Sequence, residues 1–220
     1  MIRLQELCKE FRGHGQRVLV ADRLCATFPA RRSVALLGRN GAGKSTLLKM
    51  IAGTEEATSG AILSTGTISW PVGFSGALHP RLSGVQNVRF VARIYGVDSD
   101  QLLDFVQDFA QLGRQIRAPF SSYSSGMRAR LAFGLSMGLG FDTYLVDEVT
   151  AVGDAAFRER SSELFRERLQ RAGAIVVSHS MPQLRELCDM GAVLEQGKLR
   201  LFEDVGEAID CHLANMARAA

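Results

Sequence analysis

Residues 38–45, GRNGAGKS, match the pattern G-x-x-x-x-G-K-[S/T], which is typical of loops that bind phosphate groups. The glycines let backbone N–H groups curl around phosphate oxygens, because no Cβ atom stands in the way. Lys44 places a charge against the β- and γ-phosphates, which also makes it a catalytic candidate, and Ser45 offers a hydroxyl to Mg²⁺. The predicted nucleotide site consists of Gly38, Arg39, Asn40, Gly41, Ala42, Gly43, Lys44, Ser45 and Thr46.

Two adjacent carboxylates, Asp147 and Glu148, follow the apolar run TYLV. In phosphoryl transfer, one carboxylate can hold the magnesium shell while the other orients and deprotonates the attacking water. We assign Asp147 to Mg²⁺, directly or through a water molecule, and Glu148 to the catalytic water. The alternative is that the pair simply begins a helix, but the upstream phosphate loop favours the catalytic interpretation.

His179 follows a third apolar run, AIVVS, at a point where a ligand is expected. A neutral imidazole can donate one hydrogen bond to a γ-phosphate and accept another from the water or a backbone group. We therefore predict a catalytic role for His179, with a purely structural role as the alternative. The other histidines lack such a setting and are expected on the surface: His14, His79 and His212.

A second stretch with anion-binding character, YSSGMRAR at residues 123–130, lies far from the phosphate loop in sequence. Two serines and a glycine directly precede a run that reads as a helix. A helix start with small residues and free backbone N–H groups can bind an anion. The question is why one small protein carries two such loops.

The elements that position these residues read as a parallel α/β sheet. Apolar runs at 34–38, 143–148 and 174–179 are typical of buried strands, with a short helix closed by Gly53 after the first. Strands that alternate with helices place ligands at the carboxyl ends of the strands. We expect one domain over residues 1–220, with a helical subdomain inserted at about 75–140.

The periphery reads differently from the core. Residues 1–30 and about 192–202 alternate in polarity and contain turn residues, which indicates antiparallel β structure. The fold class is therefore α/β, with a mainly parallel core sheet, a peripheral antiparallel β-subdomain and the inserted helical subdomain.

Composition excludes several classes of protein. The net charge of +3 is too small to argue for nucleic acid, and we expect no nucleic-acid partner. The four cysteines form no ligand-like cluster and are expected to be reduced. The N-terminus carries charges where a signal peptide needs an apolar core, and residues 131–141 are too short to span a bilayer. We expect a soluble chain that, if it works at a membrane, docks onto a protein that spans it.

Together these motifs resemble ATP-binding cassette ATPases, the nucleotide-binding subunits of ABC transporters, which have a P-loop NTPase fold. The resemblance covers the whole chain and implies ATP hydrolysis with Mg²⁺. It places Phe11 where an aromatic residue stacks on adenine, although Phe11 could instead be a core residue of the β-subdomain. It also makes Asp154 the D-loop aspartate, and it identifies the residues of the signature loop: Ser124, Ser125, Gly126 and Met127.

The resemblance explains the two loops. In this family the inserted lobe holds the signature loop away from the phosphate loop of its own chain, and two chains pair head to tail. Each signature loop then acts in trans on ATP bound by the other chain. We therefore expect a homodimer with ATP sandwiched at the interface, joined to two polytopic membrane permease subunits.

Departures from the usual family pattern narrow the subfamily. The chain reads DEVTAVGD where most members have Asp-Glu-Pro, and Met127 replaces the usual glutamine. These features are similar to exporters of bacterial surface polysaccharides, most closely the capsular type, and the chain ends soon after the cassette. The resemblance implies an ATPase on the cytoplasmic face of the inner membrane, with a capsule-export accessory protein. Alternatives are an O-antigen or teichoic-acid exporter and, less so, a soluble ABC protein without a transporter.

The loop that usually carries a magnesium-sensing glutamine has Phe74 instead. We assign no metal ligand there. Phe74 could pack against the membrane partner or lie in the core. We expect the apolar segment 72–82 to contact the permease.

Overall fold

The computed structural model describes residues 1–13, 16–74, 76, 78–147 and 154–218. The chain forms two compact units. The first comprises Met1–Pro71, Phe141–Glu148 and Leu169–Ala220, and the second comprises Val72–Gly140 and Val149–Arg168. Within the described part of the chain, none of the helices combines the length and apolar character needed to cross a membrane.

The first unit contains a six-stranded sheet in the order β5-β6-β7-β3-β8-β9. Neighbouring strands from β5 to β8 are parallel, and β9 runs antiparallel to β8. All residues of β3 and β7 are buried, which explains why their sequences are apolar apart from Ser33 at the start of β3. The strands are β3 (Ser33–Leu37), β5 (Ile68–Pro71), β6 (Thr143–Asp147), β7 (Gly173–Val177), β8 (Met190–Glu195) and β9 (Lys198–Phe202).

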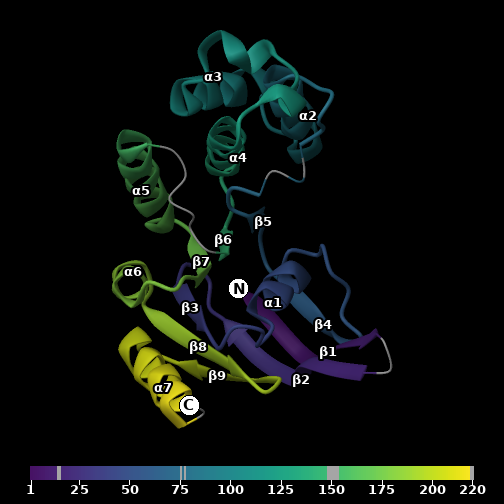
Figure 1. Cartoon of the computed structure of the whole chain (residues 1–220), viewed down its shortest axis with the longest axis vertical. Coiled ribbons are helices and arrows are strands. Elements are labelled where there is room, and N and C mark those ends of the chain that lie inside the picture. Colours follow the sequence, from purple (N-terminus) through teal and green to yellow (C-terminus); the bar gives the residue numbers. More distant parts are fainter. Residues whose placement is uncertain (14–15, 75, 77, 148–153, 219–220) are drawn as a thin grey trace. The chain divides into compact units, whose positions relative to one another are not determined.

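A separate antiparallel sheet, in the order β2-β1-β4, contains the peripheral β structure predicted for residues 1–30 (Figure 1). The prediction was wrong for residues 192–202, which fall in β8 and β9 of the six-stranded sheet, although β9 does run antiparallel to β8. The strands of the separate sheet are β1 (Ile2–Gly13), β2 (Gln16–Phe28) and β4 (Ser59–Ser64). Leu7 of β1 and Leu24 of β2 are paired and buried in the same hydrophobic cluster as Leu36 of β3. This shared cluster packs the two sheets into one unit. The helices of this unit are α1 (Lys44–Ile51), α6 (Met181–Leu187) and α7 (Val205–Arg218).

The second unit is helical. Phe109 of α3 lies at its centre, with its ring centroid 5.6 Å from Phe133 of α4 and 5.2 Å from Phe157 of α5. These contacts pack α5 against α3 and α4. The sequence did not indicate this packing. The bounds of 75–140 for an inserted subdomain stay a prediction. The elements are α2 (Gly84–Tyr95), α3 (Ser99–Ala110), α4 (Ser125–Leu139), α5 (Ala155–Leu169) and the 3₁₀ turns Gly113–Arg117 and Phe120–Ser122.

Polar caps fix where the helices of the second unit begin. Ser83 forms a capping box with Gln86 at the start of α2, and Asp98 accepts hydrogen bonds from Asp100 N and Gln101 N at the start of α3. Asn87 is fully buried and bonds the backbone of His79, which holds the turn that leads into α2. Local chemistry therefore determines these helix starts.

Candidate functional site

The phosphate loop joins the end of β3 to α1, the strand–loop–helix arrangement that the sequence predicted. Gly43 is the N-cap residue of α1, with φ of 101°. The Lys44 ammonium turns back over the loop and donates to the carbonyl oxygens of Gly38 at 2.7 Å and Arg39 at 3.1 Å. The loop thus holds its lysine beside its own backbone, at the positive end of α1.

The loop leaves no room for side chains at two of its glycines. A Cβ atom at Gly38 would lie 2.4 Å from Leu194 O, and one at Gly43 would lie 2.2 Å from Val20 Cγ1. At Gly41, by contrast, a Cβ atom would meet nothing within 4 Å. Gly41 and Gly43 both have positive φ, 82° and 101°. Glycine is therefore required at Gly43 by packing as well as by backbone conformation.

Replacing Gly43 with alanine should destabilise the loop more than replacing Gly41. Both variants bear the cost of a positive φ, but only Gly43→Ala adds a clash with Val20 of β2. Overpacking of this kind costs about 1–3 kcal/mol, so Tm should fall by roughly 3–10 °C more for Gly43→Ala. Thermal unfolding of the two variants measures the difference, and equal Tm values would contradict the close packing of Val20 on this loop.

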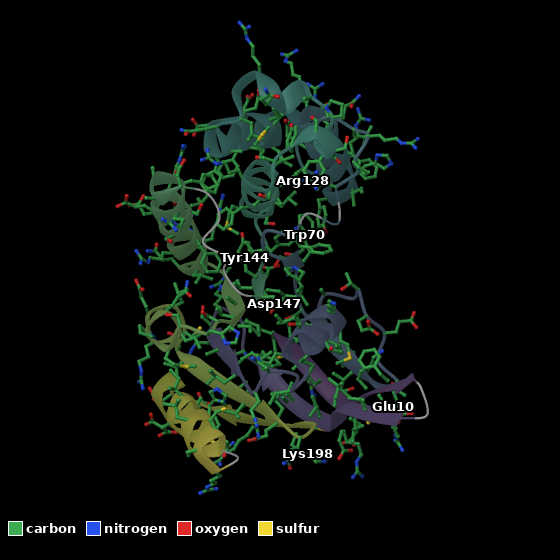
Figure 2. All side chains as sticks on the ribbon, viewed as in Figure 1. Glu10, Trp70, Arg128, Tyr144, Asp147 and Lys198 are labelled. Carbon is green, nitrogen blue, oxygen red and sulfur yellow. The ribbon has the colours of Figure 1, made fainter. Side chains whose placement is uncertain are left out.

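Asp147 and His179 lie at the same edge of the sheet as the phosphate loop. The neighbouring strands β6, β7 and β3 are parallel, and Asp147 pairs in register with Val177 at the end of β7. His179 follows two residues later and is exposed. Asp147, labelled in Figure 2, lies at the end of β6 and is half-buried. The three predicted pieces thus meet at the carboxyl edge of three adjacent strands. Glu148 lies outside the described residues.

The predicted surface position of His212 is wrong. The residue is buried, with 9% exposure, on α7. Burial lowers the pKa of its imidazole, the charge of Lys44 lowers this pKa further, and Glu195 opposes both. His79 is exposed as expected, and His14 lies outside the described residues. The charge of Lys44 thus acts on a histidine of the C-terminal helix α7, although the two residues are far apart in the sequence.

Phe11 lies on β1, paired across the sheet with Val18 of β2. Its side chain is 42% exposed. The alternative of an ordinary core residue is therefore wrong, because a core phenylalanine would be buried. An exposed aromatic ring on a strand is suited to stacking on a planar ligand.

The signature stretch begins α4. Ser124 is the N-cap residue, and its side chain accepts from Met127 N at 3.3 Å. Arg128 anchors the preceding turn by donating to Tyr123 O at 3.1 Å and Ser121 O at 2.9 Å (Figure 2). A Cβ atom at Gly126 would meet nothing within 4 Å, so this face of the helix start is open. The geometry is that of an accessible helix N-terminus.

Asp154 accepts two interactions in the second unit. Its carboxylate caps α5 by accepting from Phe157 N at 2.9 Å, and it pairs with Arg130 of α4 at 2.7 Å. The Phe157 N–H holds the pKa of Asp154 below its ordinary value, and the Arg130 guanidinium adds to this. Arg130 also lies over the Phe157 ring at 4.7 Å. Asp154 therefore links the helix of the signature stretch to α5.

Residues 21–151 match the family model described as ABC transporter. The chain belongs to the ABC transporter family. It is 46% identical over 96% of its length to the polysialic acid transport ATP-binding protein KpsT of Escherichia coli, of which the match covers 95%. It is 48% identical over 80% of its length to the capsule polysaccharide export ATP-binding protein CtrD of Neisseria meningitidis, covering 82% of CtrD.

More distant relatives and one solved structure complete the comparison. O-antigen and teichoic acid export ATP-binding proteins match at 32–37% identity. The dimeric post-hydrolysis structure of the ATP-binding cassette MJ0796, bound to ADP and Pi, matches with a TM-score of 0.75 at 19% identity, covering 92% of this chain and 98% of its own. The predicted ABC fold is confirmed. ABC ATP-binding domains bind and hydrolyse ATP, as predicted for this chain.

Phe74 is 52% exposed, so the alternative that it lies in the core is wrong. The outward side of α2 in the same unit also carries apolar residues, Phe90, Ile94 and Tyr95, at 50%, 63% and 42% exposure. The sequence singled out Phe74, but it did not indicate the α2 face. The i, i+4 spacing of Phe90 and Ile94 in the sequence could have indicated this face of α2.

Proposed function

We propose that this chain is the ATP-hydrolysing subunit of an exporter of capsular polysaccharide across the bacterial inner membrane, peripheral on its cytoplasmic face. The observation that carries the proposal is its identity of 44–48% with ATP-binding proteins of polysialic acid and capsule export. Identity falls to 32–37% with the O-antigen and teichoic acid counterparts. The same similarity is our ground for expecting a capsule-export accessory protein.

Genetics tests the exported polymer. Deleting the gene in its own organism should leave capsular polymer inside the cell, because the permease loses its energy source. Wild-type chain supplied on a plasmid should restore surface capsule, whereas Lys44→Ala should not. Loss of O-antigen or teichoic acid from the surface, with capsule unchanged, would overturn the assignment in favour of the alternative.

We propose the following roles at the ATP site for residues of the first unit. Phe11 stacks on adenine, the residues from Gly38 to Thr46 enclose the phosphates, and Lys44 neutralises their charge. Glu148 accepts the proton of the attacking water, and His179 donates to the γ-phosphate.

A magnesium ion fits the residues present. Ser45 is exposed one residue after Lys44, and Asp147 is a half-buried carboxylate on the same sheet edge, so both offer the oxygen ligands that Mg²⁺ prefers. These two residues would hold Mg²⁺, directly or through water in the case of Asp147. The ion would supply charge neutralisation at the phosphates.

We further propose that two copies form a head-to-tail homodimer with ATP sandwiched between them. The phosphate loop approaches the phosphates from one side, and stabilising the transferring phosphoryl group calls for donors on the other side as well. The open start of α4 supplies such donors in Ser125, Gly126 and the helix N-terminus. The dimeric state of MJ0796 with ADP and Pi supports this arrangement.

A mixed dimer of Lys44→Ala and Gly126→Asp chains should keep one intact site. If the signature loop acts in trans, both defects fall on one composite site, because Gly126→Asp repels the phosphates held by the partner chain. A Cβ atom at Gly126 would meet nothing within 4 Å, so the first side-chain atom of the aspartate fits without a clash. Equilibrium binding of Mg·ATP to dimers purified through two different tags should give one nucleotide per dimer.

Two control dimers frame that result. The pairing of wild type with Lys44→Ala should also bind one nucleotide, and a homodimer of the double variant should bind none. A mixed dimer that behaves like the double variant would sink the trans arrangement, since action in cis spoils both sites.

We propose two permease subunits as membrane partners, docked on apolar surface of the second unit. Phe74 and the Phe90–Ile94 face of α2 are large apolar groups left exposed there, and such groups often mark protein contacts.

Hydrogen exchange of residues 72–82 and 89–97 should slow when the permease is added, because docking shields their backbone from solvent. Residues 155–168 of α5 serve as the internal reference. Unchanged exchange in both segments, in a complex shown to be assembled, would contradict this surface.

A further inference from the structure

Lys9 lies directly beneath the ring of Phe11. The two residues share one face of β1, and the Lys9 ammonium is 4.6 Å from the centroid of the Phe11 ring. Lys9 is only 8% exposed, whereas Phe11 is 42% exposed. One side of the ring is thus occupied by a buried cation while the side chain remains open to a ligand.

The ammonium is held in place by the segment that follows α1. Lys9 Nζ donates to the Glu55 carboxylate and, at 2.7 Å, to the carbonyl oxygen of Glu56. The backbone N–H groups of Thr54 and Glu55 donate in turn to Lys49 O, in the last turn of α1. A chain of contacts therefore runs from the Phe11 ring through Lys9 to the helix that begins at the phosphate loop.

We infer that Lys9 is a positioning residue for the nucleotide base. The inference rests on the proposed stacking of adenine on Phe11. With the ammonium fixed on one face, the ring keeps a single orientation and offers its other face to the base, so less freedom is lost on binding. The cation also draws the ring's π electrons toward itself, which favours stacking of an electron-rich purine on the opposite face.

Lys9 also joins the strand that carries Phe11 to the segment that follows α1. Phe11 lies on the antiparallel sheet, whereas the phosphate loop follows β3 of the six-stranded sheet. The Lys9–Glu55 ion pair ties β1 to the chain that follows α1. A substitution at Lys9 should therefore lower the affinity for ligands that carry a base and leave the affinity for ligands that carry only phosphates unchanged.

The test compares ADP with inorganic pyrophosphate, each measured by calorimetry in the presence of magnesium. Lys9→Met keeps the length of the side chain but removes its charge. We expect ADP to bind about threefold to tenfold more weakly, the size of one cation–π or stacking contact. Pyrophosphate affinity should change by less than about twofold, since no base is involved. Lys9→Arg, which retains a cation, should restore most of the ADP affinity.

The control is Lys198→Met, which removes another lysine ion pair of the same unit, with Asp22. Among the described residues, no aromatic ring stacks on the Lys198 ammonium. This substitution should change neither affinity. Thermal unfolding reports whether Lys9→Met remains folded. If it does not, Glu55→Gln replaces it, because weakening the hold on Lys9 should also lower ADP affinity without lowering pyrophosphate affinity.

A double-mutant cycle with Phe11→Leu separates the positioning role of Lys9 from the stacking role of Phe11. In that background Lys9→Met should have no further effect on ADP binding. If Phe11→Leu weakens ADP but Lys9→Met does not, the role of Lys9 is overturned and the stacking role of Phe11 stands. If Phe11→Leu leaves ADP affinity unchanged, both roles are overturned, while pyrophosphate binding still reports an intact phosphate loop. Equal losses for ADP and pyrophosphate in Lys9→Met would indicate a general structural role and also overturn the inference.

Discussion

Replacing Lys44 with alanine should bring ATP hydrolysis close to baseline in a chain that remains folded. The substitution removes the charge that neutralises the β- and γ-phosphates, and one such electrostatic contact is worth about 10²–10³-fold in rate. The ammonium also donates to Gly38 O and Arg39 O, so its removal frees two loop carbonyls as well. Steady-state phosphate release by the purified variant measures the effect.

Lys49→Ala is the matched control. Lys49 is an exposed lysine in the last turn of the same helix, α1, and no phosphate role is assigned to it. Its variant should hydrolyse ATP at the wild-type rate. Substantial turnover by a contaminant-free Lys44→Ala sample would overturn the assignment of residues 38–45 as the ATP site.

Glu148→Gln should bind Mg·ATP and hydrolyse it roughly 10²–10⁴-fold more slowly than wild type. The amide keeps the shape and the hydrogen-bonding capacity of the carboxylate but cannot take the proton of the water. Single-turnover hydrolysis, measured beside equilibrium binding of ATP, separates the two effects. His179→Ala should behave similarly.

Glu203→Gln, at an exposed glutamate that follows β9, is the matched control. It should change neither the rate of hydrolysis nor the affinity for ATP. If Glu148→Gln instead loses nucleotide binding while turnover per bound ATP is unchanged, the division of roles between Asp147 and Glu148 is wrong.

The phosphate loop could be predicted in full because its chemistry lies within consecutive residues. The glycines, Lys44 and the helix that starts there act over one turn of chain, so the pattern determines the local backbone. The helix after the signature stretch was also predictable, although α4 begins at Ser125, so that Ser125 and Gly126 lie within it rather than before it. The antiparallel character of residues 1–30 was predicted as well. The strands β3 and β7 were predictable because strands buried on both faces have unbroken apolar sequences.

Relations between distant residues could not be predicted, because they depend on strand order and packing. The sequence predicted that Asp147 and His179 lie at the carboxyl ends of strands in the same sheet, but only the structure gives the order β6-β7-β3 that places them beside the phosphate loop. The stack of Phe109, Phe133 and Phe157 gathers α5 onto α3 and α4. The i, i+2 spacing of Lys9 and Phe11 on a strand was visible, but a cation beneath the ring also needed Glu55 of a separate segment.

The sequence by itself determined the family, the nucleotide loop and the kinds of element, since each depends on short-range patterns of residue type. Only the tertiary structure decided that His212 is buried within reach of the Lys44 charge, that Phe74 is exposed, and that Lys9 supports the ring of Phe11. Burial and charge at these positions arise from neighbours far away in the chain. A side chain's environment is set by the packing of whole elements, and no local pattern records that packing.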